Sequence, residues 1–101
     1  MLRTLTTVAL AALCGPAWAQ QLQPDAGRNL AAPCAICHGT NGSNAGGLPN
    51  LAGQPKNYIA QQMRDFRDGK RPATIMHQIA KGYTEPQIEA LAEFFAAQKV
   101  R

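Results

Sequence analysis

The stretch Cys34-Ala35-Ile36-Cys37-His38 decides how this chain is built. Its two cysteines are three positions apart, so one turn of helix brings both thiols to the same side. A histidine follows the second cysteine directly, and Pro33 stands just before the first. Any interpretation of the chain therefore has to explain two thiols and an imidazole that are presented together.

This spacing is typical of covalent attachment of haem c. Haem has two vinyl groups on neighbouring edges, and two thiols three residues apart in one helical turn can reach both of them. A histidine directly after the second cysteine then lies under the ring and can bind the iron. The sequence predicts one haem c bound through Cys34 and Cys37, with His38 as an axial ligand of the iron.

Three other interpretations of the cysteines fit less well. A thioredoxin-like redox pair needs a βαβ context, and the sequence offers no candidate strand. A structural zinc ion needs four ligands, whereas only His77 and the adjoining His38 could complete the set. A disulfide across two intervening residues would close a very small loop and stabilise little.

Residues 1–19 have the features of a secretory signal peptide. Arg3 supplies the positive start, residues 8–13 an apolar run, and Ala17-Trp18-Ala19 a cleavage site of small residues around one large one. The apolar run is far shorter than the roughly 20 residues that span a bilayer. We therefore expect a single domain over residues 20–101, exported to the periplasm and without a membrane span once the signal is removed.

The composition of residues 20–101 excludes several classes of protein. Nine Lys and Arg stand against six Asp and Glu, a net charge of +3 with Lys70-Arg71 as the one adjacent basic pair, so no nucleic acid partner is indicated. The whole chain is 46% apolar and 16% charged, which disfavours disorder. A domain this small buries only about 60% of its unfolded surface and often needs a cofactor or another covalent support.

Helical signals recur along the chain and no segment alternates as a strand does, so we predict an all-α fold. The clearest helix begins at Thr84, which forms a capping box with Gln87 and precedes an apolar stripe at helical spacing. Weaker signals predict helices over about 25–32, 55–68 and 74–81. Between Gly39 and Pro55 lie five glycines and no helical period, which we interpret as backbone that approaches a flat surface closely or takes positive φ.

The chain resembles class I (mitochondrial-type) bacterial cytochromes c over essentially all of residues 20–101. The matching features are the cysteine motif after a short helix, the segment Leu-Pro-Asn-Leu-Ala-Gly at 48–53, a downstream methionine, and a last helix with Leu91 and Phe94. The resemblance implies a small fold of three to five helices around one haem, and single-electron transfer as the function. It also implies that Gly27 contacts Phe94, and that the Pro49 carbonyl accepts the Nδ1–H of His38. A ligating histidine needs its other N–H accepted.

The second axial ligand has three candidates: Met63, Met76 and His77. Met63 falls in the apolar sector of a predicted helix beside Ile59 and Phe66, where a methionine usually fills a core. Met76 lies in an irregular connection, and the resemblance also places the ligand before the last helix. We therefore predict Met76, while His77, expected at the surface, leaves a bis-histidine alternative.

Other residues are expected around the haem. Arg71 and Tyr83 either contact the haem propionates or form solvated surface, and the sequence does not choose between these. The expected pocket and core residues are Tyr58, Ile59, Phe66, Ile75, Ile79, Leu91 and Phe95.

A narrower resemblance covers residues 71–76 and 79–84, which are similar to the haem subunit of flavocytochrome c sulfide dehydrogenase. It implies a redox partner that is a sulfide-oxidising flavoprotein, with this chain passing electrons and not catalytic alone. Many such subunits carry two haem domains, whereas this chain has one motif. The alternatives are a free electron carrier to a terminal oxidase or other reductase, and a haem peroxidase or gas sensor whose sixth position opens.

Overall fold

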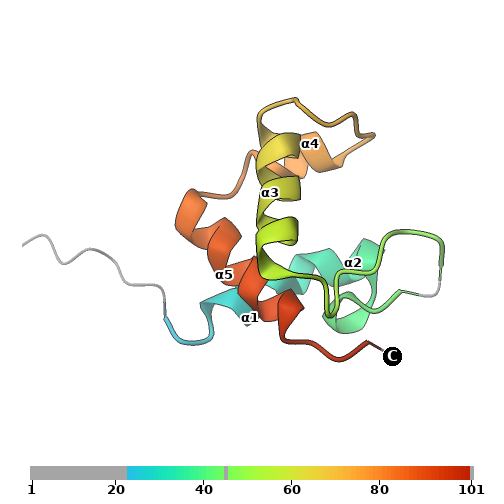
Figure 1. The fold of residues 1–101 in the computed structure, drawn as a ribbon, viewed down its shortest axis with the longest axis vertical. Helices are drawn as coiled ribbons and strands as arrows, with labels where there is room; N and C mark the ends of the chain where they lie inside the picture. Colours follow the sequence, from blue (N-terminus) through green and yellow to red (C-terminus); the bar gives the residue numbers. More distant parts are fainter. Residues whose placement is uncertain (1–22, 45, 101) are drawn as a thin grey trace, which may run out of the picture.

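The structure is a computed structural model that describes residues 23–44 and 46–100; the predicted signal peptide lies outside them. Its helices are α1 (Ala26–Ala31), α2 (Ala35–His38), α3 (Lys56–Arg67), α4 (Met76–Ala80) and α5 (Glu85–Ala96), with 3-10 turns at Ala32–Cys34 and Thr40–Gly42. No strand occurs within the described ranges, and the predicted all-α class is confirmed (Figure 1).

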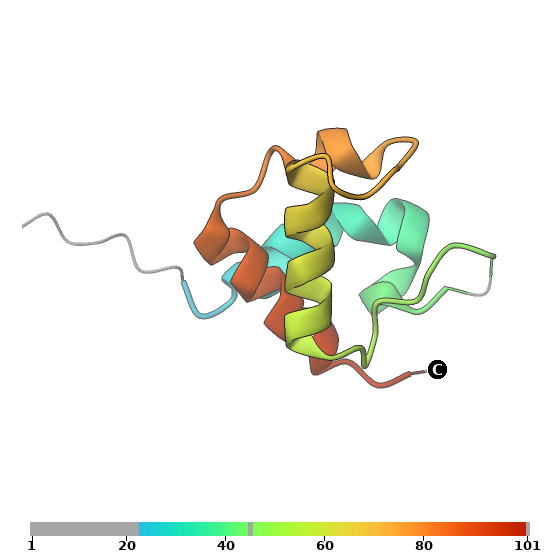
Figure 2. The same cartoon turned by 45° about the horizontal axis from the view of Figure 1, so that its top comes forward.

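Helix α3 packs against α5 and also against α4, which lies near the C-terminal end of α3 (Figure 1). The first and last helices, α1 and α5, pack against each other. In both ribbon views, α2 and α4 lie on the same side of α3 (Figures 1 and 2). The cysteine motif and the Met76 segment therefore face the same flank of α3.

The crossing of α1 and α5 depends on the missing side chain of Gly27. A Cβ atom built there would lie 2.5 Å from the carbonyl oxygen of Ala90 and 3.2 Å from the Cβ of Phe94. The two backbones thus touch, and the expected contact between Gly27 and Phe94 is confirmed. Phe94 itself is half-buried against the core.

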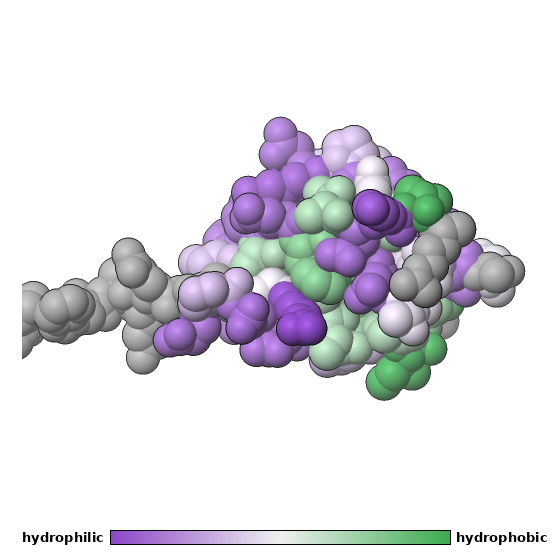
Figure 3. Space-filling model, turned by 90° about the horizontal axis from the view of Figure 1, so that it is seen from below, coloured by the Kyte–Doolittle hydropathy of each residue, from purple (hydrophilic) through white to green (hydrophobic). Residues whose placement is uncertain are grey.

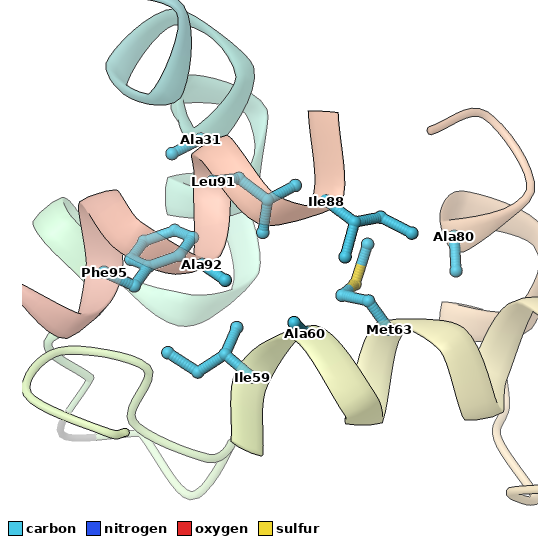
Figure 4. Close-up of a cluster of buried hydrophobic side chains, with 9 residues drawn as sticks. All are labelled: Ala31, Ile59, Ala60, Met63, Ala80, Ile88, Leu91, Ala92 and Phe95. Atoms are coloured by element: carbon cyan, nitrogen blue, oxygen red, sulfur yellow. The ribbon is translucent and has the colours of Figure 1, made fainter. Parts of the chain in front are cut away.

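The core forms where α1, α3, α4 and α5 meet, and it is entirely apolar among the described residues (Figure 4). Phe95, Ile88 and Leu91 are its largest fully buried side chains. Burial confirms the predictions for Ile59, Leu91 and Phe95. The Met63 side chain points from α3 toward Ile88, so this methionine fills the core as predicted (Figure 4).

Three residues expected in the haem pocket or the core are not part of the protein core: Tyr58, Ile75 and Ile79 are exposed, and their place in a haem pocket stays a prediction. In α3, Ile59 and Met63 are buried as predicted, whereas Tyr58 is exposed. Ala60, which was not among the expected core residues, is fully buried between α3 and α5.

The start of α5 is fixed by the predicted capping box. The Gln87 backbone N–H donates to the Thr84 Oγ1 at 3.4 Å, and the Thr84 N–H donates to the Gln87 Oε1 at 2.9 Å. Two N–H groups that no helical carbonyl could accept are thereby satisfied. The prediction of this helix, with Thr84 as its N-cap, is confirmed.

Ion pairs connect α3 to α5 along their exposed side. Arg64 donates to Glu85 at 2.9 Å and also to Glu89, while Arg67 lies 2.7 Å from Glu85. Lys56 continues the row with Glu89 at 3.3 Å. The hydrogen bonds from Arg64 and then Arg67 hold the pKa of the Glu85 carboxyl below its ordinary value.

Candidate haem site

The cysteine motif occupies one continuous helical stretch. Cys34 ends the first 3-10 turn, and Cys37 and His38 form the last two residues of α2. Both cysteines are free thiols, so the structure contains no disulfide between them. Gly39 ends the helix with φ of 83°, and a Cβ there would lie 2.0 Å from the Ser43 carbonyl oxygen. Only glycine allows the chain to turn back so tightly after His38.

The His38 ring is held by the loop that follows it. Its Nδ1 lies 2.8 Å from the carbonyl oxygen of Pro49. A carbonyl can only accept, so Nδ1 carries the proton and donates it to this bond. In the neutral imidazole this leaves the lone pair on Nε2, which is the form that binds a metal ion.

The Cys34 thiol is in contact with Tyr83, a residue of the turn between α4 and α5. Burial raises the pKa of the Cys34 thiol, and a hydrogen bond with the Tyr83 hydroxyl partly opposes that rise. Burial likewise raises the pKa of Tyr83. The same hydroxyl donates to the Leu30 carbonyl at 3.1 Å, so Tyr83 connects α1 to the segment before α5.

Arg71, the other residue considered for the propionates, also has partners within the chain. Its guanidinium stacks on the Phe66 ring, 4.7 Å from the centroid, and it donates to the Gln62 side chain. Arg71 and Tyr83 thus each have a partner within the chain, and their contact with the haem propionates stays a prediction.

The candidates for the second axial ligand occupy different environments. Met76 is the first residue of α4 and is half-buried at the edge of the core, whereas Met63 lies inside the core. His77 is half-buried, and its Nδ1 is buried without a hydrogen-bond partner in the described part of the chain. The expectation that His77 lies at the surface is therefore wrong.

Large apolar side chains are exposed beside each candidate haem-binding residue. Ile36, between the two cysteines, is 87% exposed, and Ile75, next to Met76, is 57% exposed. Leu48 before Pro49 and Ile79 one turn after Met76 are exposed as well. Figure 3 shows apolar residues reaching one face of the surface. Two thiols, an imidazole with a free Nε2, a thioether and apolar neighbours fit a group that is apolar, planar and iron-containing.

Comparison with known proteins agrees with this geometry. Residues 24–99 match the profile of a family described as Cytochrome c. The chain belongs to the cytochrome c family. It is thus an electron-transfer protein of the kind that carries covalently bound haem c.

Several relatives are similar to this cytochrome c. The cytochrome subunit of sulfide dehydrogenase from Chlorobaculum tepidum is 38% identical over 87 residues, which cover 83% of this chain and 79% of that protein. The thiosulfate dehydrogenase electron acceptor of Thiomonas intermedia is 39% identical, and the match covers 98% of this chain but 45% of that protein. The solved structure of Acidithiobacillus ferrooxidans cytochrome c4 matches with a TM-score of 0.65 at 35% identity, covering 74% of this chain and 51% of that one.

No helix within residues 23–44 and 46–100 combines the length and apolar character needed to cross a membrane.

Proposed function

We propose that this cytochrome c holds one haem c through Cys34 and Cys37, with His38 and Met76 as the axial ligands, and carries single electrons in the periplasm. The observation that supports it best is the 2.8 Å contact between the His38 Nδ1 and the Pro49 carbonyl. The histidine that makes this contact directly follows the second cysteine of the Cys-x-x-Cys motif. Because Nδ1 donates to the carbonyl, Nε2 is the nitrogen that can bind the iron. A surface histidine without such a partner would rotate freely and make a poor ligand.

Bound haem iron would supply a one-electron couple. The chain's own residues determine what that couple can do. His38 and Met76 would together hold the iron, which would leave no open position for small molecules such as O₂, and a thioether ligand would raise the reduction potential relative to two histidines. Ile75 and Ile79, beside Met76, are exposed apolar side chains that would exclude water from a haem bound there.

We propose a sulfide-oxidising flavoprotein as the electron donor. This proposal is supported by the similarity to the sulfide dehydrogenase subunit of Chlorobaculum tepidum, 79% of which the match covers. The similarity to thiosulfate dehydrogenase electron acceptors supports the alternative, a free carrier in sulfur-compound oxidation. Purification of the protein from its native host distinguishes them: co-purification of a flavoprotein favours the first, and a monomer without one favours the second.

The attachment is tested by exporting the chain in a host that matures c-type cytochromes. Intact mass reports the loss of residues 1–19 and the number of haems, and a reduced-minus-oxidised spectrum reports the ligands. We expect one haem, lost in a Cys34→Ser, Cys37→Ser double variant. A colourless wild-type product whose two thiols react with an alkylating agent would overturn the proposal.

A further inference from the structure

The side chain of Asn44 joins two segments of the loop that follows α2. Its Nδ2 donates to the Leu48 carbonyl at 3.2 Å and lies 3.5 Å from the Cys37 carbonyl. Its Oδ1 accepts the Gly46 backbone N–H at 2.7 Å. One carboxamide thus uses both its donor and its acceptor capacity to hold the loop.

The two carbonyls that Asn44 contacts belong to residues next to His38 and Pro49. Cys37 immediately precedes His38, and Leu48 immediately precedes Pro49. The Asn44 amide therefore contacts the residue before His38 and the residue before Pro49. His38 and Pro49 are the two partners of the hydrogen bond from the imidazole Nδ1–H to the Pro49 carbonyl. That bond joins positions eleven residues apart, in a loop that the Leu51 N–H also closes by donating to the Gly42 carbonyl at 2.8 Å.

Asn44 is itself fixed by a second asparagine. Its backbone N–H donates to the Asn50 side-chain oxygen, and Asn50 follows Pro49 directly. The carbonyl of Asn50 lies 3.5 Å from the Gln54 Nε2 at the end of the loop. The Pro49 carbonyl is thus held from both sides, by Asn44 through Leu48 and by Asn50 through its own backbone.

We propose that Asn44 is a positioning residue for the axial imidazole: it keeps the Pro49 carbonyl within reach of the His38 Nδ1–H. This inference rests on the proposed function, because it assigns His38 to the iron. A hydrogen bond to the other ring nitrogen makes a ligating histidine more basic and fixes its orientation. Loosening the loop therefore weakens this bond and lowers the basicity of the ligand, which raises the reduction potential.

The test compares holoprotein variants by NMR and by redox titration. Asn44→Ser keeps an oxygen that can accept from Gly46 but is too short to bridge the two carbonyls. Asn44→Ala removes both the donor to the two carbonyls and the acceptor for the Gly46 N–H. Asn57→Ser, at an exposed position of α3, is the matched control for the same exchange of residue types. All four proteins are neutral at the substituted position, so the potential is not shifted by an added charge.

The first readout is a ratio of two hydrogen-exchange rates. The rate of the His38 Nδ1–H is divided by the rate of the Leu91 backbone N–H, which reports opening of the core. We expect this ratio to rise roughly fivefold in both Asn44 variants, about 1 kcal/mol or one lost hydrogen bond. The reduction potential should rise as well. Asn57→Ser should match the wild type in both readouts.

A lower thermal stability with an unchanged ratio and potential would show that Asn44 only supports the loop, and would overturn the inference. Loss of haem from the Asn44 variants but not from Asn57→Ser would support it, since the ligand would then be misplaced altogether. A wild-type protein without haem would instead overturn the proposed function, so the two failures are distinct.

Discussion

The two residues proposed to bind the iron, His38 and Met76, are held in place in different ways. His38 ends a helix and is held by a hydrogen bond to the loop that follows. Met76 begins a short helix after an irregular connection and is half-buried by packing alone. The imidazole is therefore fixed by a directional contact, whereas the thioether depends on how α4 rests against α3.

Substitutions of Met76 and Met63 test which methionine is the second axial ligand. We expect Met76→Ala to abolish the methionine–iron charge-transfer band and to lower the reduction potential, because the thioether stabilises the reduced iron. Met63→Ala should keep the band but lower the free energy of unfolding by about 2–5 kcal/mol, since it leaves a cavity in the core. Optical spectra and thermal unfolding check both.

His77→Ala addresses the bis-histidine alternative in the same experiment. If His77→Ala removed a ligand signature that Met76→Ala left intact, the assignment of Met76 would be wrong. Rapid binding of carbon monoxide by the reduced wild-type protein would likewise contradict two occupied axial positions.

The cysteines and His38 were predicted from a fixed spacing, whereas the contact of Pro49 with His38, which the structure contains, was predicted from the resemblance to class I cytochromes c. Sequence reasoning missed the contacts of Asn44 and Tyr83. An asparagine in a glycine-rich segment indicates a turn, but which carbonyls its amide meets depends on the path of an irregular backbone. Tyr83 meets Cys34 across the junction of three segments, and no local pattern encodes such a meeting.

At the scale of helices, the close contact between the backbones of α1 and α5 leaves no room for a side chain at Gly27. We expect Gly27→Ala to lower the free energy of unfolding by about 1–3 kcal/mol, because the added methyl group would collide with the Ala90 carbonyl and force α1 away from α5. Denaturant unfolding of the holoprotein measures the change. Asn29→Ala, exposed on the same helix, should stay within about 0.5 kcal/mol of the wild type.

The capping box gives a second prediction at this scale. Thr84→Ala removes the acceptor for the Gln87 N–H, so we expect a loss of about 1 kcal/mol in the free energy of unfolding. Thr84→Ser keeps the hydroxyl and should restore most of it. Equal stability of the alanine and serine variants would mean that the box contributes nothing measurable.

The limits of pattern analysis for helices are visible in α3. Its position and length follow from Pro55 and Gly69, and Ile59 and Met63 are buried as predicted, but the burial of Ala60 was not predicted. Helical periodicity states which side chains share a face and not which neighbour that face meets. Ala60 is buried in the core that α3 shares with α5, whereas Tyr58 is exposed.

For the molecule as a whole, the ion pairs between α3 and α5 make stability depend on pH. The folded-state pKa of Glu85 is below its ordinary value of 4.5, so this carboxylate stabilises the fold above that value. The contribution is lost as the pH falls from 4.5 through the folded-state pKa. We expect the free energy of unfolding to decline over this acidic range and high salt to reduce the decline.

Glu85→Gln removes this titration and should flatten the acidic part of the stability curve, as measured by denaturant unfolding at a series of pH values. Glu93→Gln is the control, since Glu93 is more exposed and reaches only Lys56, at 3.8 Å. A curve for Glu85→Gln that runs parallel to the wild type would contradict the assignment.

The close packing of α1 on α5 joins the two ends of the described chain. The cysteine motif follows α1 directly, so the helix that precedes it docks against the last helix of the fold. We therefore expect α1, and the motif beside it, to be held in place only once the C-terminal helix is present.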